Sequence, residues 1–253
     1  MARSISKNRI IRTIFTQLAP VYDVLDGLIT WGQGRAWRKK AFAVGTIPAP
    51  RRVLDACAGT GLLTAELAKR YNPKTHIIAI DFCPAMANVT RQRLRELNLQ
   101  RRVEVKVENV EIMPFPDEFF DVAYISLGLR FVSDVKVAVR ELHRVLKPGG
   151  RLVVLELCQP PGKFRRSLAH WVRDKFFPTW EKWLHRIPRE LLYPIHDSLI
   201  HYPDPTKLSR RFVRIGFDHV EYSYLSGGLA TLHHATKFFP RHAHLEEELQ
   251  QVQ

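Results

Sequence analysis

The sequence predicts an α/β fold, with a doubly wound and mostly parallel sheet of seven strands. The main observation is that short apolar runs, typical of strands, alternate with segments whose apolar residues recur at helical spacing. A glycine-rich turn directly follows the first strand, and a closing pair of strands is joined at Gly227-Gly228. The first predicted strand ends at Val53-Leu54. The other six cover residues 77–80, 102–107, 120–126, 151–156, 220–224 and 230–236.

The first strand leads into the turn around which the chain is organised. Val53 and Leu54 end a short apolar run, and Gly59 and Gly61 then allow the positive φ that a tight strand-to-helix turn demands. Apolar residues at helical spacing predict a helix over residues 62–71. Together these features predict a strand, a turn and a helix in direct succession.

An acidic residue follows the second strand. Asp81 comes about twenty residues after Gly61, where a carboxylate is placed to accept hydrogen bonds from two ribose hydroxyls. A dinucleotide site would require a third glycine, but Thr64 occupies that position. Asp55, at the end of the first strand, repels a pyrophosphate and suits an ammonium or sulfonium cation. The pattern predicts S-adenosylmethionine (SAM) as cofactor; the alternative is a helix-capping turn without a ligand.

The middle of the chain continues the alternation. Helices are predicted over residues 84–97 and 134–146, and Lys147-Pro148-Gly149-Gly150 ends the second. The first of these helices is expected to turn Met86, Val89, Leu94 and Leu97 inward. Because ligands bind at the carboxyl ends of parallel strands, polar residues at those ends are expected to line one pocket. These residues are Asp55, Asp81, Asn109 and Ser126.

The first 45 residues are predicted to form lid helices over the mouth of the cofactor site. An apolar helical stripe ends at Pro20, and a basic, aromatic helix follows over residues 35–40. The stripe consists of Ile10, Ile11, Ile14, Phe15 and Leu18. This segment is too apolar to be a free tail.

The alternation breaks after Glu156, where residues 158–205 are expected to form an inserted, mainly helical cap. Aromatic residues such as Trp171 and Trp183 are interleaved with basic residues over 165–186. This pattern suits the headgroup layer of a membrane, but also a nucleic-acid face or the solvated side of a packed helix pair. A last helix over residues 206–215 follows the cap.

Composition narrows the class of protein. The 253 residues suffice for one large domain, and 39 Lys plus Arg against 25 Asp plus Glu give a formal charge of +14. This charge favours nucleic acid or acidic lipid as a partner, or is simply the basic surface of an enzyme. Three cysteines without metal spacing predict core thiols, a reducing compartment and no metal. No apolar run approaches the roughly 20 residues that span a bilayer, so we expect a cytoplasmic, peripherally membrane-associated protein.

Several segments resemble the ubiquinone/menaquinone biosynthesis C-methyltransferase family, which belongs to the class I, Rossmann-like SAM-dependent methyltransferases. The glycine turn, Asp81 and residues 146–150 match the wider class. The narrower family is matched by residues 15–23, 37–38, 125–130, 197–204, 216–222, 225–228 and 232–233. The similarity runs from about Phe15 to Lys237. With the patterns above, we predict lid helices over residues 1–45, a methyltransferase domain over 46–237 that includes the cap, and a flexible tail over 238–253.

The resemblance implies methylation of a ring carbon in a polyprenylated quinol precursor, such as demethylmenaquinol or a methoxy-polyprenyl-benzoquinol. The family's cofactor-binding positions fall on Thr60, Asp81, Asn109, Val110 and Ser126, and neighbouring residues expected at the cofactor are Asp55, Gly59, Gly61 and Phe82. The head group, the tail length and the formation of homo-oligomers stay open.

Three positions depart from the family pattern. Asn109 replaces the usual Asp, although its side-chain oxygen can still accept a hydrogen bond from the adenine amino group. Phe131 replaces the Asn that usually follows the active-site arginine, which is Arg130 here. His201 stands where a basic residue is usual. These departures bear on the substrate more than on the cofactor.

The expected chemistry needs a ring hydroxyl to lose its proton, because carbon alone is a poor nucleophile. Arg130 is expected to stabilise the phenolate or to orient a water that takes the proton; the alternative is a structural ion pair. His201 titrates in the range suited to a base. Tyr22 and Asp23 are expected to bond the second ring oxygen or to close the lid over SAM, unless they only cap a helix. Weaker candidates are His196, Asp197 and His233.

Three other functions stay open at this point. One is methylation of another small phenol or amine. Another is a non-catalytic SAM-binding subunit of a quinone-synthesis assembly, which Arg130 opposes and Phe131 favours. The third is RNA methylation, which only the basic charge suggests. Because the sequence has no recognisable RNA-binding module, nucleic acid is not expected as a partner.

Overall fold

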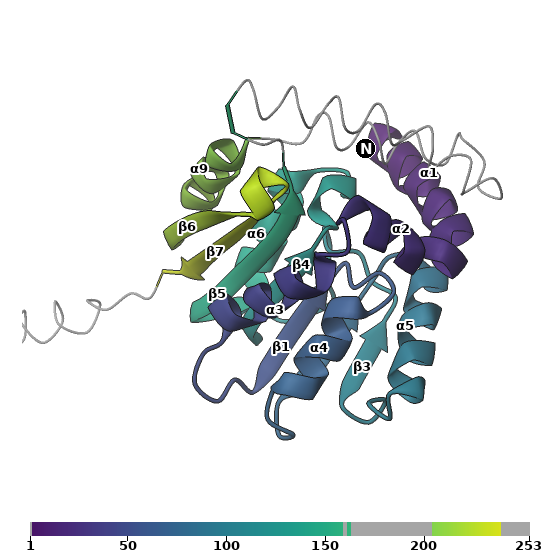
Figure 1. The fold of residues 1–253 in the computed structure, drawn as a ribbon. Coiled ribbons are helices and arrows are strands. Elements are labelled where there is room, and N and C mark those ends of the chain that lie inside the picture. The colour runs from purple at the N-terminus through teal and green to yellow at the C-terminus, as the bar shows by residue number, and fades with distance from the viewer. Residues whose placement is uncertain (1, 159–160, 163–203, 239–253) are drawn as a thin grey trace, which may run out of the picture.

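The computed structural model describes residues 2–158, 161–162 and 204–238, and a seven-stranded sheet forms the centre of this part of the chain (Figure 1). The strand order is β3-β2-β1-β4-β5-β7-β6. The strands are β1 (Arg52–Ala56), β2 (His76–Ile80), β3 (Val103–Lys106), β4 (Phe120–Ser126), β5 (Leu146–Leu157), β6 (Phe217–Leu225) and β7 (Ala230–Lys237). β1 to β5 pair in parallel, whereas β7 pairs antiparallel with β5 and β6. The predicted fold class is confirmed.

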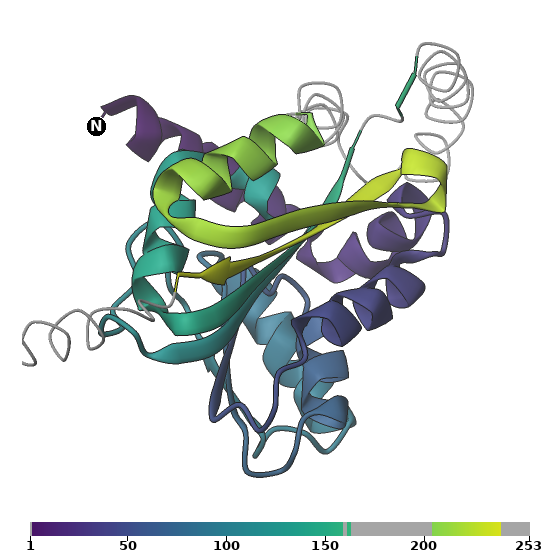
Figure 2. The ribbon, with the colours of Figure 1, turned by 90° about the vertical axis from the view of Figure 1, so that its left-hand side faces the viewer.

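Helices cover both faces of the sheet. They are α1 (Ala2–Leu18), α2 (Tyr22–Ile29), α3 (Gly34–Gly45), α4 (Leu62–Arg70), α5 (Pro84–Glu96), α6 (Val135–Val145) and α9 (Pro205–Ile215), with 3-10 turns η1 (Ala19–Val21), η2 (Leu129–Phe131) and η3 (Ser226–Gly228). In Figure 2 the twisted sheet separates α9 from α3. α1 packs along α5 at the end of the molecule where the parallel strands terminate (Figure 1).

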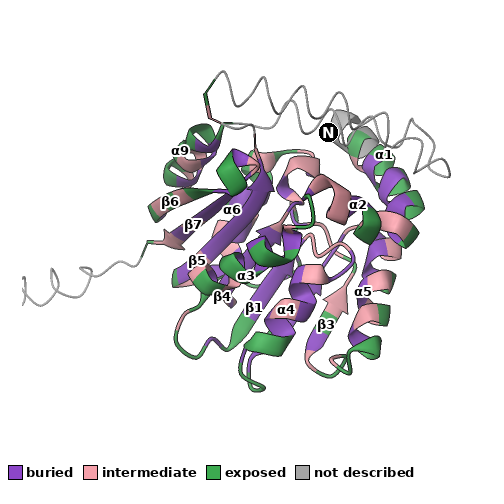
Figure 3. Cartoon of the chain, viewed as in Figure 1, coloured by how far each residue is buried: buried purple, intermediate pink, exposed green. Residues whose placement is uncertain are grey.

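Two buried clusters hold the layers together, one on each face of the sheet (Figure 3). Under α6 and α9 the cluster contains Phe120 and Phe212, both without exposed surface. Under α3 and α4 it contains Trp37, and Tyr124, whose hydroxyl bonds that of Tyr71 at 2.6 Å. Burial of such side chains contributes roughly 1.5–3 kcal/mol each, so the sheet is a rigid platform for its loops.

Some predictions for single residues differ from the structure. Ile10 is 56% exposed because it lies beside the stripe that α1 buries, and Leu97 is 39% exposed because it caps α5 beyond its last buried turn. Residues 147–150, predicted to end α6, are also part of β5. Leu146 pairs with Phe120 and Arg151 with Val122, so the residues between them bulge from β5.

Some predicted segments lie outside the described residues. These are most of the predicted cap, including the 165–186 segment, and nearly all of the predicted tail. Among the helices that the structure describes, none is long and apolar enough to cross a membrane.

Candidate active site

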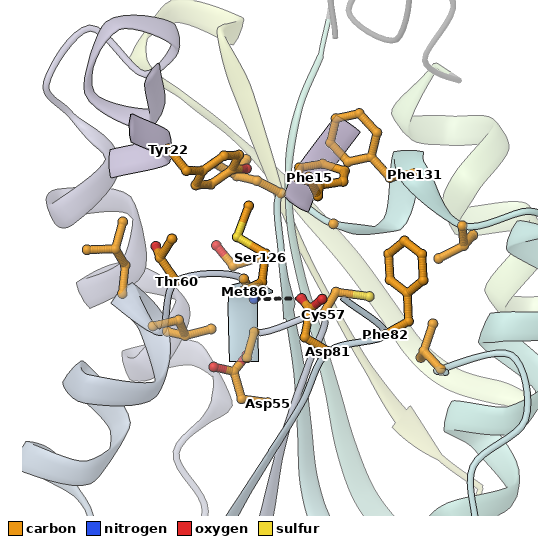
Figure 4. Close-up of a pocket in the computed structure, with 18 of the residues that line it drawn as sticks. Phe15, Tyr22, Asp55, Cys57, Thr60, Asp81, Phe82, Met86, Ser126 and Phe131 are labelled. Carbon is orange, nitrogen blue, oxygen red and sulfur yellow. Dashed lines mark hydrogen bonds between the residues drawn. The ribbon is translucent and has the colours of Figure 1, made fainter. Parts of the chain in front are cut away.

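A pocket opens at the carboxyl ends of the parallel strands, beside β1, where the strand order reverses (Figure 4). Its empty space is about 850 Å³, including the mouth. Four strand-end residues line it together, as the spacing predicts: Asp55, Asp81, Asn109 and Ser126. Gly59, Thr60, Phe82 and Val110 also line it. α1 and α2 contribute Phe15 and Tyr22, so the N-terminal helices cover this pocket.

The glycine turn is locked against α5. Gly61 has a φ of +81° and a Cβ there would lie 2.8 Å from Thr90 Cγ2, so both conformation and space require glycine. The Thr90 hydroxyl donates a 2.7 Å hydrogen bond to the carbonyl of Gly59. Gly61 itself is the N-cap of α4 and does not line the pocket.

Asp81 is oriented by two backbone N–H groups. Its carboxylate accepts a hydrogen bond from Gly59 N at 2.8 Å (Figure 4) and another from Cys83 N at 2.9 Å. Burial raises the pKa of Asp81 to about 6, against the lowering effect of these bonds. The side chain is therefore a fixed acceptor at the end of β2.

Asp55 presents an oxygen without a partner. Its Oδ2 accepts a 2.5 Å hydrogen bond from the hydroxyl of Thr64, while Oδ1 is buried and unbonded among the described residues. Burial raises the pKa of Asp55 to about 7. Thr64, where a dinucleotide site would have glycine, therefore positions the carboxylate. A buried, unsatisfied carboxylate oxygen in a pocket calls for a cationic donor, as the ammonium group of SAM provides.

A buried ion pair that the sequence does not predict also lines this pocket. Arg38 Nη1 and Nη2 lie 3.2 and 3.1 Å from Asp26 Oδ1 and Oδ2, and both residues line the pocket. The Arg38 charge also acts to lower the pKa of Asp55. Two carboxylates and a guanidinium thus surround one end of the pocket. The basic, aromatic segment containing Arg38 gave no spacing signal for this contact.

A short loop after β3 forms another part of the pocket wall. Asn109 Oδ1 accepts a 2.9 Å hydrogen bond from Glu111 N, which fixes the side chain at the pocket. Val110 is buried beside it. Val110 provides an apolar edge and Asn109 a polar one, and together they suit a purine ring.

A second, smaller pocket adjoins the first. It has about 330 Å³ of empty space and is lined by Tyr22, Asp26, Ile29, Leu127, Arg130, Phe131 and Leu157. Tyr22 and Phe131 line both pockets. Burial, with the charge of Asp26, raises the pKa of Tyr22, so its hydroxyl stays protonated. The second pocket thus combines apolar side chains with the phenol of Tyr22, the guanidinium of Arg130 and the carboxylate of Asp26.

Arg130 is held by a fully buried carboxylate. Glu156 Oε2 accepts a 2.8 Å hydrogen bond from Arg130 Nε and a further bond from Nη2. Glu156 Oε1 accepts a 2.7 Å bond from Leu129 N. Side-chain exposure is 3% for Arg130 and 0% for Glu156. The structural ion pair considered for Arg130 therefore exists, and Arg130 lines the second pocket at the same time.

The carboxylate of Asp23 faces the glycine turn. It accepts a 2.6 Å hydrogen bond from the Thr60 hydroxyl and pairs with Arg93 of α5. Arg93 Nε also donates a 2.7 Å bond to the Thr60 carbonyl. Asp23 lines neither pocket, so its contacts favour the lid-closing alternative over bonding to the substrate ring.

Three aromatic rings lie together on one side of the larger pocket: those of Phe15, Tyr22 and Phe131 (Figure 4). The ring of Phe15 lies 4.9 Å from that of Phe131, edge to face, and 5.8 Å from that of Tyr22. The side chain that departs from the family pattern, Phe131, is thus part of the wall that a substrate would meet.

The histidine candidates differ in placement. His196, Asp197 and His201 lie outside the described residues. His233 is buried in β7, where Nε2–H donates a 3.1 Å hydrogen bond to the Pro205 carbonyl, and burial lowers its pKa to about 4. It lines neither pocket. Among the described residues, no group of three His, Cys, Asp or Glu side chains is placed to hold a metal ion.

The chain is similar to known proteins in both sequence and fold. The sequence model described as the ubiE/COQ5 methyltransferase family matches residues 3–237. The ubiquinone/menaquinone biosynthesis C-methyltransferase UbiE of Shewanella sp. (strain W3-18-1) is 31% identical over 232 residues, which is 92% of each chain. A SAM-dependent methyltransferase from Thermotoga maritima superposes with a TM-score of 0.63 at 20% identity, over 90% of this chain and 99% of that one. One from Aquifex aeolicus gives 0.57 at 18%, over 79% and 88%.

Proposed function

The chain belongs to the ubiE/COQ5 methyltransferase family and is a SAM-dependent methyltransferase, and from this premise we propose that it methylates a ring carbon of a polyprenylated quinol. The acceptor would be of the demethylmenaquinol or methoxy-polyprenyl-benzoquinol type. The observation that carries the proposal is the pair of adjoining pockets, one with the features of a SAM site and one that Arg130 and Tyr22 line.

The larger pocket suits SAM in both shape and charge. Asp55 Oδ1 would accept from the ammonium group, and the Arg38 guanidinium would face the carboxylate at the same end. Asp81 would accept from the ribose hydroxyls. The loop at Asn109 and Val110 would flank the adenine. Gly59, Thr60, Gly61, Phe82 and Ser126 would complete the contacts or shape the turn. When bound, SAM supplies an electrophilic methyl group.

The smaller pocket suits the aromatic ring of the acceptor. One ring hydroxyl would lose its proton to a base, and the ring carbon beside it would form the new bond to the methyl group while the electron pair of the carbon–sulfur bond stays on sulfur. The ring carbon would then release its own proton to the base or to water, which restores aromaticity. Arg130 would stabilise the phenolate charge, because a fixed guanidinium in a buried site interacts strongly with an oxyanion.

Tyr22 would donate a hydrogen bond rather than remove a proton. Its raised pKa keeps the hydroxyl protonated at neutral pH, so it would bond the second ring oxygen. Glu156 would position Arg130. The base stays a proposal for His201, or for a water that Arg130 orients.

A bilayer partner follows from the polyprenyl tail. We propose that residues 165–186, which lie outside the described residues, contact the membrane. The protein would then lie at the cytoplasmic face of that membrane. The tail would leave the second pocket on its apolar side, which Ile29 and Leu157 form.

A second candidate is methylation of a different phenol, and Phe131 favours it. This side chain fills space beside Arg130 where the family pattern has a polar Asn. A panel of acceptors separates the two candidates: reduced demethylmenaquinone, a methoxy-polyprenyl-benzoquinol, simple phenols and an aromatic amine, each with labelled SAM. We expect transfer to the quinols. Transfer confined to the simple phenols or the amine, or SAM binding without any transfer, would overturn the proposal.

A further inference from the structure

Two helices on one face of the sheet carry an unusual concentration of positive charge. Six cations line a single groove between α6 and α9: Lys136, Arg140, Lys207, Arg210, Arg211 and Arg214. No acidic side chain lines this groove. We call these six residues the α6–α9 basic face.

The charges of this face are not neutralised within the described part of the chain. Other cations there are paired, such as Arg93 with Asp23 and Lys147 with Asp121. None of the six has an ion pair with a described residue, and all but Arg211 are exposed. Like charges held together repel one another, so the face lowers the stability of the fold unless an anion covers it.

The α6–α9 basic face begins beside the mouth of the cofactor pocket. Val132 lines that pocket, and α6 starts three residues later. The N-terminal part of α1 is bonded to the same corner. Lys7 Nζ donates to the Val132 carbonyl at 2.7 Å, and the Ser133 hydroxyl donates to Asn8 Oδ1 at 2.6 Å. In Figures 1 and 2, α9 and the N-terminal part of α1 lie at the same end of the molecule. A surface bound to this face would therefore lie next to the pocket.

The neighbouring side chains distinguish between polyanions. Val137 and Val213, on the same helices, are 37% and 59% exposed, as suits a headgroup layer. No aromatic side chain lines the groove, whereas proteins that bind single-stranded nucleic acid stack bases on such rings. The two helices thus carry exposed apolar residues besides the charges of the groove, and the groove lacks a stacking platform.

We propose that the α6–α9 basic face binds the anionic headgroups of a lipid bilayer and sets the pocket mouth against the membrane. This inference rests on the proposed function, because only an acceptor with a polyprenyl tail requires a bilayer. It is separate from the predicted contact of residues 165–186. Basic side chains near an anionic membrane surface act together and are screened by salt.

The test compares two charge-reversed proteins for binding to vesicles. The first carries Lys136→Glu, Lys207→Glu and Arg210→Glu. Two of these positions lie in the first turn of a helix, where a carboxylate is tolerated. The control carries Lys40→Glu, Lys74→Glu and Arg101→Glu, which are exposed positions of equal charge change away from this face. Binding is measured by sedimentation with vesicles of phosphatidylcholine alone or mixed with phosphatidylglycerol.

We expect binding of the full-length protein to the mixed vesicles only, decreasing with added salt. The first variant should lose at least about tenfold in partition coefficient, while the control keeps wild-type binding within about twofold. Equal losses in both variants would show a general charge effect and overturn the proposal. Tight RNA binding that the first variant alone loses, without vesicle binding, would also overturn it.

Methyl transfer to a short-chain quinol in solution keeps the two proposals apart. Neither variant touches the pockets, so both should methylate this acceptor as the wild type does. Lost vesicle binding with intact transfer in solution supports the face as a membrane contact. Intact vesicle binding by the first variant overturns the inference while leaving the proposed reaction untouched. Absence of transfer by the wild type would overturn the proposed function instead.

Discussion

The carboxylate of Asp23 accepts a 2.6 Å hydrogen bond from the hydroxyl of Thr60, and so ties α2 to the glycine turn. The two residues are 37 positions apart in the sequence. Arg93 of α5 pairs with the same carboxylate and donates to the Thr60 carbonyl, which makes the contact a three-element junction. One wall of the cofactor pocket is therefore held by a side chain that does not line it.

Loss of this junction should weaken SAM binding. Asp23→Asn removes the negative charge with which Arg93 pairs and to which the Thr60 hydroxyl donates. Helix α2 and the glycine turn should then move more independently. We expect the Kd for SAM to rise about fivefold to tenfold, the equivalent of one hydrogen bond of about 1–1.4 kcal/mol, measured by titration calorimetry. Asp117→Asn breaks an exposed ion pair with Arg144 instead, and serves as the control. Equal effects of the two substitutions would contradict the role of Asp23.

Arg38 should recognise the carboxylate of SAM. Decarboxylated SAM keeps the sulfonium and the amine but lacks that group, so the wild type should bind it at least about tenfold more weakly than SAM. Since Arg38→Gln alone would leave Asp26 buried without its partner, the variant tested is Asp26→Asn with Arg38→Gln. This variant should bind both ligands with similar affinity. Preserved discrimination by a folded variant would refute the assignment.

Asp55 should make the stability of the free protein depend on pH. Its pKa in the folded protein, about 7, exceeds its usual value of 3.8, so the folded state binds more protons between these two values. The contribution of Asp55 to the free energy of unfolding is therefore fully present below about pH 4 and is lost as the pH rises through 7. Asp55→Asn should raise the free energy of unfolding at pH 8, by at most about 4 kcal/mol for three pKa units.

The same substitution should have the opposite effect on SAM. Asn cannot offer the ammonium group a charged acceptor, so the variant should be stable yet bind SAM at least about tenfold more weakly. Wild-type affinity should decrease as pH falls below 7, and the affinity of the variant should change less over that range. The pH dependence of SAM affinity that remains in the variant comes from Asp81, whose pKa is also raised by burial, to about 6. Thermal unfolding and calorimetry across pH 5–8 measure both effects.

Glu156 should act through Arg130 on turnover rather than on SAM binding. Glu156→Gln keeps an acceptor for Leu129 N but no longer holds the guanidinium as an ion pair. We expect kcat to fall by about tenfold to a hundredfold, while the SAM Kd stays within about twofold. The pH profile of kcat should shift with it, which a purely structural role would not cause. A proportional loss of SAM affinity would contradict this account.

The parts of the site that the sequence predicts are local. Strand ends, the turn at Gly59 and Gly61, and Asp81 follow from spacing, because parallel strands bring their carboxyl ends to one edge. Asp55 and Thr64 are nine residues apart on one strand–turn–helix unit, although their hydrogen bond was not foreseen.

The partner of each buried charge could not be predicted in the same way. Arg38 meets Asp26 from a neighbouring helix, and Arg130 meets Glu156 from a strand 26 residues later. Neither contact produces a periodic pattern or a motif in the sequence, because both depend on how separate elements pack together. Phe131 shows the converse: its departure from the family pattern is visible in the sequence, but its packing on Phe15 is a tertiary contact.

The central claim is methyl transfer to a ring carbon in the pocket beside Arg130. The most direct measurement uses SAM labelled with ¹³C in its methyl group and a reduced demethylmenaquinone, with the product analysed by NMR. The account predicts label on the ring carbon with the wild type, and a loss of about a hundredfold or more in rate with Arg130→Lys at unchanged SAM affinity. Label on a ring oxygen, or undiminished transfer by Arg130→Lys, would contradict it.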